Sequence, residues 1–163
     1  MEYVAEDFRH AAALLRDHPA WLDIRAAIEA IDRKAVIAKQ DDLAAAGRAP
    51  RGGQRAVNAL FEDLLPEPSW EHQPRLFDAP ELRKWKMDFL KARVGVEVSF
   101  NHAEAIPWQF TRLNIAGESE RVIEGSRIDV GVVITATESL KAWSKMDSAV
   151  GTFDAFKAWL REM

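Results

Sequence analysis

The chain has 163 residues, a formal net charge of −4 and no cysteine. This length suits one domain with a sizeable core, and the lack of cysteine excludes disulfide bonds and thiolate metal sites. The negative charge argues against a protein that coats nucleic acid indiscriminately, although it leaves room for a focused basic cleft. No apolar run approaches the roughly 20 residues that span a bilayer, and the first residues lack a signal peptide's pattern. We therefore expect a cytoplasmic protein without a membrane partner.

The first part of the chain, residues 1–65, has the patterns of helices. Apolar residues at three- and four-residue intervals predict an amphipathic helix over residues 3–17. A longer helix is predicted over residues 20–46 on the same evidence. A third helix is predicted over residues 54–65, where Pro66 ends it.

A loop over residues 47–55 connects the second and third helices. It contains three glycines, one proline and three arginines, but no acid. One interpretation is a solvated surface loop. The other is an arm that contacts phosphates, because glycine permits close backbone approach and arginine binds phosphate through a bidentate fork. Under the second interpretation, Arg51, Gly53 and Arg55 are the contacts.

The second part of the chain has the patterns of strands. An edge strand is expected over residues 70–77, where a proline cannot donate to a neighbouring strand. Two segments rich in apolar and β-branched residues follow, over residues 85–90 and 93–100. The short polar piece Lys91-Ala92 joins them, so together they predict a β-hairpin.

The rest of the chain alternates helix and strand. A helix is expected over residues 103–116, and a buried strand over residues 127–135. Because a helix joins them, this strand is expected to lie parallel to the strand at 93–100, with the helix on one face. Two further helices are expected over residues 137–146 and 152–162.

These elements predict an α/β (α+β) fold, with a mixed central β-sheet flanked by helices. We expect a single domain over residues 1–163. Its helical part covers residues 1–65, and its sheet core covers residues 66–163.

Two acids stand opposite one another in the predicted hairpin, Asp88 in one strand and Glu97 in the other. Because side chains alternate across a strand, Glu97 and Ser99 share one face while the intervening valines take the other. Two carboxylates on adjacent strands suit a hard cation such as Mg²⁺, although solvent-facing acids are the simpler alternative. Basic side chains around the hairpin give a local positive excess that suits a polyanion: Arg83, Lys84, Lys86, Lys91 and Arg93.

Five segments carry a resemblance to a known family. They are Gly52-Gly53-Gln54, Trp70, Lys86-Met-Asp88-Phe, Val96-Glu97-Val-Ser-Phe-Asn101 and Arg127-Ile-Asp-Val-Gly-Val-Val-Ile-Thr135. In this order they resemble the BglII/BstYI-type restriction endonuclease family, within the PD-(D/E)xK nuclease superfamily. The resemblance implies a homodimeric, Mg²⁺-dependent type II enzyme that cuts both strands of double-stranded DNA at a short palindromic site.

The resemblance also implies roles for individual residues. Asp88 and Glu97 would bind the metal together with the carbonyl of Val98, and Ser99 would complete the catalytic set. A metal held against the scissile phosphate neutralises developing charge and lowers the pKa of a water molecule for in-line attack. The residues expected to contact DNA are Arg51, Gly53, Arg55, Lys86, Lys91, Asn101 and His102.

Ser99 departs from the family's pattern, in which Lys, Glu or Gln stands two residues after the metal-binding glutamate. Serine can hydrogen-bond a water molecule, but it supplies no positive charge. Either Ser99 positions the water, or Lys91, Lys86 or His102 fills the gap, or catalysis is weak or lost. For His102 the simpler interpretation is a residue that starts the following helix, and for Asn101 a turn residue at the strand end.

Three functions therefore stay open. Two carboxylates favour the restriction endonuclease, while Ser99 favours a catalytically silent PD-(D/E)xK domain that binds DNA or a partner protein. A third is a nuclease that acts on RNA or branched DNA. Family members usually continue into another strand after the final helix, so a compact or truncated form is expected here.

Overall fold

A four-stranded sheet forms the centre of the computed structural model, which describes residues 2–48 and 52–163. Its strands lie in the order β1-β2-β3-β4. The first three are antiparallel neighbours, and β4 is parallel to β3. This arrangement confirms the mixed central sheet. The strands are β1 (Glu71–His72), β2 (Phe89–Lys91), β3 (Val94–Ser99) and β4 (Val130–Thr135).

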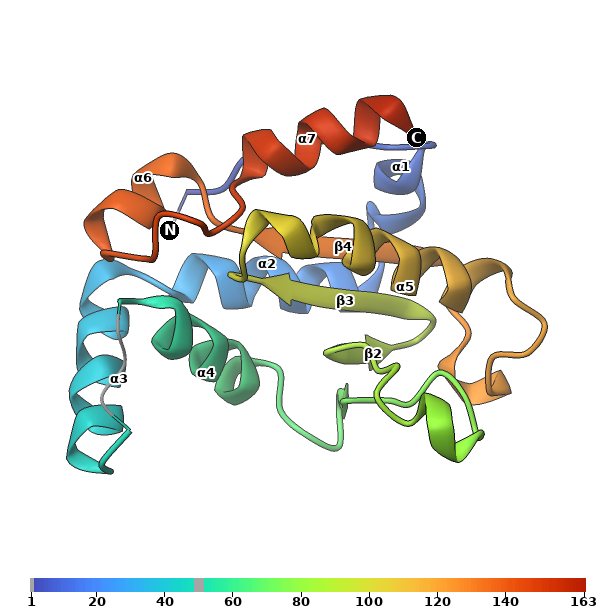
Figure 1. Ribbon diagram of the computed structural model, residues 1–163, viewed down its shortest axis with the longest axis horizontal. Coiled ribbons are helices and arrows are strands. Elements are labelled where there is room, and N and C mark those ends of the chain that lie inside the picture. Colours follow the sequence, from blue (N-terminus) through green and yellow to red (C-terminus); the bar gives the residue numbers. More distant parts are fainter. Residues whose placement is uncertain (1, 49–51) are drawn as a thin grey trace.

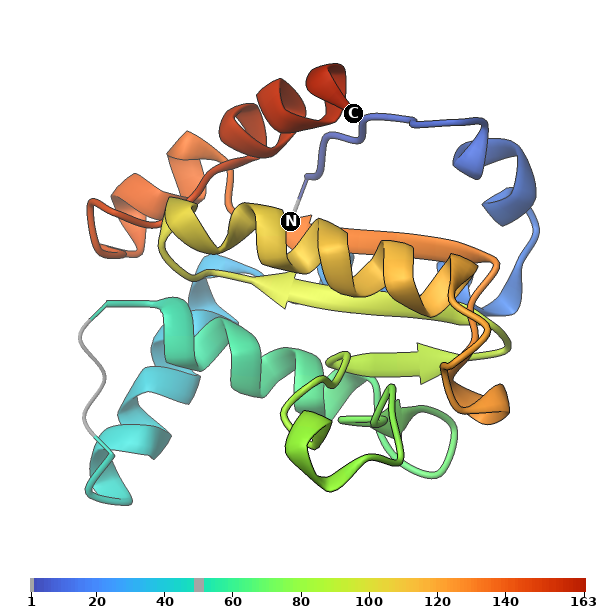
Figure 2. The ribbon, with the colours of Figure 1, turned by 45° about the vertical axis from the view of Figure 1, so that its right-hand side comes forward.

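Helices cover both faces of this sheet, with α5 on one side and α2 on the other (Figure 1, Figure 2). Short 3-10 turns lie at Pro80–Leu82, Ala103–Ala105 and Glu124–Ser126. None of the helices in the described ranges combines the length and the apolar content needed to cross a membrane. The α-helices are α1 (Ala11–Leu15), α2 (Pro19–Ala30), α3 (Arg33–Ala45), α4 (Gln54–Leu64), α5 (Ile106–Glu118), α6 (Glu138–Trp143) and α7 (Phe153–Glu162).

The predicted hairpin is present as β2 and β3. Phe89 pairs with Val96, and Lys91 still pairs with Val94, so the turn lies one residue later than predicted. Its two residues, Ala92 and Arg93, have φ values of 46° and 65°. Two successive left-handed residues are typical of type I′ turns, whose twist matches that of the flanking strands.

The two faces of β3 pack against different sets of helices. Val94, Val96 and Val98 point into the larger core, which includes residues of α2 and α4. Gly95 points the other way, where a Cβ would lie 2.7 Å from Met87 Sδ. Because side chains alternate, Glu97 shares the face of Gly95 and lies under α5.

Helix α5 and strand β4 agree with the predicted crossover. Helix α5 begins with Pro107 in its first turn, where the missing N–H costs nothing. The chain then returns as β4, paired with β3 in parallel from Val94↔Val130 to Ser99↔Thr135. Leu113 of α5 packs against Gly131 of β4, so the helix is fixed on the sheet.

The expected helix over residues 3–17 is wrong for most of its length. Only residues 11–15 are helical, and His10 just before them has a left-handed φ of 64°. Asp7 Oδ1 accepts a hydrogen bond from Ala12 N at 2.9 Å, so it satisfies a donor at the start of a short helix. The preceding segment has apolar residues at helical spacing, but Tyr3 uses its ring to pack edge-on against Trp21 instead.

The expected long helix over residues 20–46 is also wrong, because it is two helices. Ile31 is extended, with ψ at 94°, and ends α2. Asp32 then caps α3, accepting a hydrogen bond from Ala35 N at 2.7 Å. An aspartate at this position favours a new helix start over a continued helix.

The expected edge strand over residues 70–77 is shorter in the structure. Only Glu71–His72 pairs regularly with β2. Gln73 takes a left-handed φ of 52°, which turns the chain away. Beyond Gln73 the pairing continues irregularly, through an isolated bridge between Arg75 and Lys86 and a hydrogen bond from Leu76 N to Trp85 O at 2.9 Å.

Candidate active site

Asp88 and Glu97 lie side by side at the end of the hairpin. Asp88 immediately precedes β2, so it lies just outside the strand in which it was expected, and its N–H donates to Val96 O at 3.2 Å, next to Glu97 of β3. Asp88 Oδ2 accepts a hydrogen bond from Val98 N at 2.8 Å. Asp88 Oδ1 accepts another from Gln73 Nε2 at 3.1 Å. These bonds fix the Asp88 carboxylate against β3.

Glu97 is buried and paired with an arginine from α5. The glutamate is 1% exposed. Arg112 donates from Nε to Oε1 at 2.9 Å and from Nη2 to Oε2 at 2.5 Å. Such a two-bond fork is the strongest geometry between arginine and a carboxylate. Sequence reasoning did not identify Arg112 as a residue of this site.

The acid pair holds more negative charge than Arg112 compensates. Burial, and after it the charge of Asp88, raise the pKa of Glu97 to about 8, while Arg112 opposes both. Burial also raises the pKa of Asp88, against the hydrogen bond from Val98 and the charge of Arg112. A cation placed between the carboxylates would reverse both shifts, because opposite charge favours the ionised form.

The donor atoms at the pair are those of a hard cation. Within residues 2–48 and 52–163, no group of three or more His, Cys, Asp or Glu side chains gathers in one place. A cation between Asp88 and Glu97 would therefore complete its shell with backbone oxygens and water, as Mg²⁺ commonly does. Because Arg112 holds both oxygens of Glu97, such a cation must share them or displace the guanidinium.

A comparison with known protein families identifies the family of this chain. A family model described as "Restriction endonuclease BglII/BglIII" matches residues 3–163. The chain belongs to the BglII restriction endonuclease family. Membership places it among the nucleases that act on double-stranded DNA, and it confirms the resemblance found in the sequence. A comparison with curated proteins found no match.

In this BglII-family chain, the other residues predicted for the site follow Glu97 along the chain. Ser99 is the last residue of β3, and Asn101 and His102 come after it. Ser99 is 2% exposed and lies two residues beyond Glu97 on the same face. Asn101 and His102 are exposed just past the end of β3. The Asn101 carbonyl accepts a hydrogen bond from Gly151 N at 2.9 Å, which ties this end of the strand to the segment before α7.

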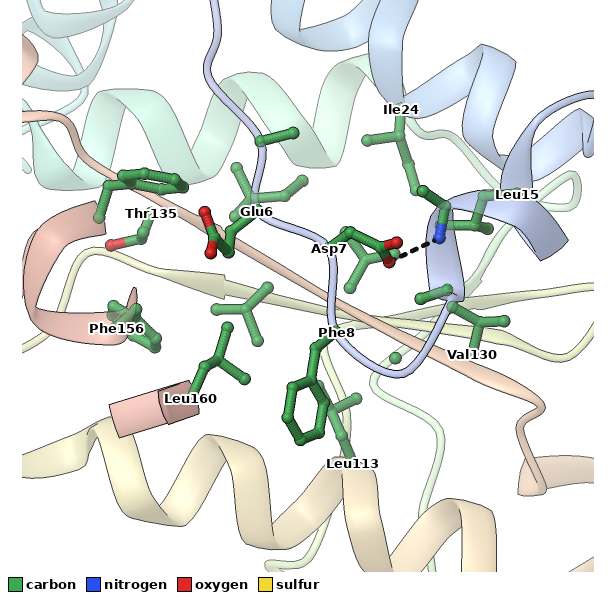
Figure 3. A pocket seen from close by; sticks show the side chains of 18 of the residues that line it. Glu6, Asp7, Phe8, Leu15, Ile24, Leu113, Val130, Thr135, Phe156 and Leu160 are labelled. Carbon is green, nitrogen blue, oxygen red and sulfur yellow. Dashed lines mark hydrogen bonds between the residues drawn. The ribbon is translucent and has the colours of Figure 1, made fainter. Parts of the chain in front are cut away.

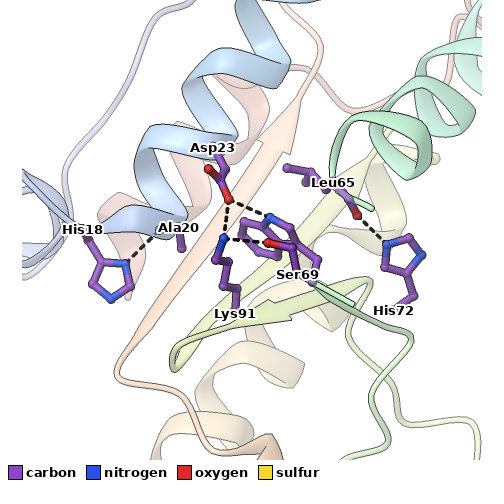
Figure 4. Close-up of polar contacts among 8 residues, drawn as sticks. His18, Ala20, Asp23, Leu65, Ser69, His72 and Lys91 are labelled. Carbon is purple, nitrogen blue, oxygen red and sulfur yellow. Dashed lines mark hydrogen bonds and ion pairs between the residues drawn. The ribbon is translucent and has the colours of Figure 1, made fainter. Parts of the chain in front are cut away.

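Lys91 is held on the side of α2 (Figure 4). Its Nζ donates to Asp23 Oδ2 at 2.6 Å and to Ser69 Oγ at 2.9 Å, and it lies 5.7 Å from the centre of the Trp70 ring. It is also three residues along the strand from Asp88, about 10 Å at the ordinary rise. The structure therefore does not bring Lys91 to the acid pair, whereas Lys86 is two residues from Asp88 and partly exposed.

Gly53, in the arginine-rich segment over residues 47–55, has a structural role in packing. A Cβ at Gly53 would lie 2.7 Å from Ser144 Cβ, so a glycine lets the start of α4 approach the end of α6. Arg55 is exposed in the first turn of α4. Arg51 lies outside the described residues. Contact of this loop with phosphate stays a prediction.

A cavity of about 860 Å³ lies elsewhere, between the N-terminal segment, β4, α5 and α7 (Figure 3). Its labelled walls include Phe8, Leu113 and Phe156, and neither Asp88 nor Glu97 lines it. An ion pair between Glu6 and Lys157, at 2.7 Å, joins the N-terminal segment to α7 beside it. This mainly apolar hollow is separate from the acid pair.

Removing the partner of the Trp70 indole is expected to destabilise the protein. Trp70 is 1% exposed, and its Nε1 donates to Asp23 Oδ2 at 3.1 Å (Figure 4). We expect Asp23→Ala to lower the free energy of unfolding by about 1–3 kcal/mol, because a buried donor loses its acceptor. Urea unfolding measures this. Asp63→Ala is the matched control, since its exposed pair with Lys39 is expected to change stability by only about 0.5 kcal/mol. Equal losses in both variants would contradict the expectation.

Proposed function

We propose that this protein is a type II restriction endonuclease that uses Mg²⁺ to hydrolyse phosphodiester bonds of double-stranded DNA at a short palindromic site. The observation that carries the proposal is the pair formed by Asp88 and Glu97. Asp88, which immediately precedes β2, is hydrogen-bonded to β3 beside Glu97, and burial raises the pKa of both acids. Buried acids brought together without full compensation are expensive, so they indicate a functional site.

The ligands of the cation in this proposal are Asp88, Glu97 and the carbonyl of Val98. The N–H of Val98 donates to Asp88, and in a strand the C=O of a residue points to the same side as its N–H. In this proposal the three oxygen donors come from the residue before β2 and from two successive residues of β3. When bound, Mg²⁺ supplies positive charge against the phosphate and acidifies a water molecule.

The chain's own residues orient the reactants. Ser99 follows Glu97 on the same face, and its hydroxyl is placed to hydrogen-bond the attacking water. Lys86, two residues before Asp88, and Asn101 and His102, past the end of β3, are proposed to bind the DNA backbone, whose contacts set register. Lys91 would reach DNA only after leaving Asp23.

Further DNA contacts are proposed for Arg51, Gly53 and Arg55. A backbone N–H at a helix start, as at Gly53, and an exposed arginine in the first turn, as at Arg55, both suit phosphate oxygens.

The second candidate is a catalytically silent domain that binds DNA or a partner protein. The observation that favours it is Ser99, which is buried beside Glu97 and carries no charge. Both candidates keep the fold, but only the enzyme requires the cation.

Incubation with duplex DNA separates these candidates. We expect discrete fragments from plasmid DNA in Mg²⁺ and none with a chelator, measured on gels. DNA that shifts in a gel but is never cut, with Mg²⁺ or Mn²⁺ present, would establish the silent domain instead. Cleavage of RNA or branched DNA but not of duplex DNA would overturn the assignment of the substrate.

We expect the protein to be a homodimer, because cutting both strands symmetrically calls for a two-fold axis. Light scattering is expected to give twice the chain mass of 18.4 kDa. The proposed interface uses the helices at residues 20–46 and 54–65, where Ile37 and Leu64 are 46% and 37% exposed. Ile37→Glu and Leu64→Glu are expected to favour the monomer, and Leu14→Glu on α1 serves as the control. A monomer with and without DNA would contradict the prediction.

A further inference from the structure

Arg112 is the cation in direct contact with the acid pair. It donates two hydrogen bonds to Glu97, and its charge acts on Asp88 as well. The other ion pairs in the described part of the chain bring no second cation to these acids. Arg112 therefore occupies the oxygens of Glu97 where a divalent cation is proposed to bind.

The Arg112 side chain can move while its helix stays fixed. The side chain is 27% exposed, against 1% for that of Glu97, so the guanidinium forms the solvent side of the pair. The next residue, Leu113, is buried against Gly131 of β4 and anchors the helix backbone. A change of partner therefore needs only rotation of the arginine side chain about its own bonds.

A buried amide without a partner lies one helical turn before Arg112. Gln109 is 1% exposed, and its Oε1 has no hydrogen-bond partner among the described residues. Residues three apart on a helix are neighbours, so Gln109 and Arg112 lie on the same side of α5. A buried acceptor without a donor is costly, and a water molecule or ligand donor arriving at the site would satisfy it.

Hydrolysis of a phosphodiester needs positive charge at the phosphate, and the two acids do not supply it. Ser99 has none, and Lys91 is engaged by Asp23 and Ser69. The arginine fork fits a phosphate as well as it fits a carboxylate. A cation that takes the oxygens of Glu97 would release Arg112 at the place where the phosphate arrives.

Building on the proposed function, we propose that Arg112 exchanges partners. It neutralises Glu97 before the divalent cation binds, and it binds a phosphate oxygen of the DNA once the cation has taken Glu97. Arg112 is then both a competitor of the metal and a contact of the substrate.

These two roles predict opposite effects of one substitution. Without DNA, Arg112→Met is expected to bind Ca²⁺ about tenfold more tightly than the wild type, because a competing cation is gone. This is measured from the unfolding temperature against Ca²⁺ concentration. With a short DNA duplex in Ca²⁺, the same variant is expected to bind about tenfold more weakly, and in Mg²⁺ to cleave about 100-fold more slowly.

Two further variants make the result specific. Arg112→Lys keeps the charge and is expected to recover part of the DNA affinity and cleavage. Lys157→Met is the control, because it removes a cation paired with Glu6 beside the separate cavity, away from the acid pair. It is expected to match the wild type in all three measurements.

Weaker Ca²⁺ binding by Arg112→Met would overturn the proposal, since Arg112 would then simply hold Glu97 in place. Wild-type DNA affinity and cleavage in that variant would overturn it too. If the wild type neither binds nor cuts DNA, the proposed function fails separately. The Ca²⁺ titration still decides the exchange at Glu97, because tighter binding supports it and unchanged binding overturns it.

Discussion

Asp88→Asn and Glu97→Gln are each expected to slow DNA cleavage by about 1,000-fold, while binding of DNA without divalent cations stays close to that of the wild type. Both substitutions keep the size of the side chain and remove its charge. The new amide oxygen at position 88 can still accept from Val98 N–H. At position 97 the amide oxygen can keep one of the two hydrogen bonds from Arg112, and the other is lost because an NH2 group does not accept. What is lost is the charged oxygen for the cation, and such electrostatic contributions carry about 100- to 1,000-fold each.

Single-turnover cleavage of a labelled duplex measures this effect. Asp129→Asn is the matched control, because Asp129 is an exposed carboxylate paired with Arg93, away from the acid pair. It is expected to cleave at the wild-type rate. Unchanged cleavage in Asp88→Asn or Glu97→Gln would remove that residue from the site.

The stability of the protein without divalent cations is expected to fall as the pH rises from 4.5 to about 8. The pKa of Glu97 is raised from 4.5 in the unfolded chain to about 8 in the folded protein, so the folded state holds this proton more tightly. The resulting stabilisation is complete below the unfolded pKa and is lost as the pH passes the folded pKa. Asp88 adds to the loss, because its pKa is shifted in the same direction.

We expect a loss on the order of a few kcal/mol across this range, measured by urea unfolding at several pH values. The control is Glu97→Gln, which has no proton to release at this position and is expected to give a flatter profile. Ca²⁺ at the alkaline end is expected to restore stability to the wild type more than to the variant. A wild-type profile that rises over this range would contradict the expectation.

The sheet was largely predictable because its signal is local. Alternation along Val94 to Ser99 assigned Glu97 to the face opposite the valines, and the structure agrees. The apolar run at Val130–Thr135, after a helix, predicted the parallel strand. The predicted turn was one residue too early. The actual turn residues, Ala92 and Arg93, have left-handed φ values, but neither is the Asn or Gly that usually marks such positions in a sequence.

Arg112 was missed because its position depends on how α5 rotates about its axis over the sheet. Ile106, Gln109, Leu113 and Ala116 are the buried positions of that helix, at the spacing of one face. Arg112 lies beside this buried face of α5. Gln109 on that face was the one sequence signal that the helix covers a polar site. Spacing alone does not reveal that the facing strand residue is Glu97.

The helix boundaries in residues 1–65 were predicted wrongly where an aspartate side chain accepts a hydrogen bond from a backbone N–H. Asp32 interrupts an otherwise continuous apolar pattern, and its capping bond to Ala35 N begins α3. Asp7 acts similarly on Ala12 N. The spacing of apolar residues continues through such positions and so does not show where one helix ends and the next begins. The capping hydrogen bonds of the Asp side chains set these boundaries.

Gly95 affects the site without contacting it, because its missing side chain leaves room for a neighbouring residue. Met87 immediately precedes Asp88, and its sulfur fills the room that a methyl group at position 95 would need. A methyl group at position 95 would have to displace the Met87 sulfur and the side chain of Ile128, which lie on the face of the sheet that also carries Glu97. Variants at position 95 would therefore act on the acid pair only indirectly, through the packing of the residue that precedes Asp88.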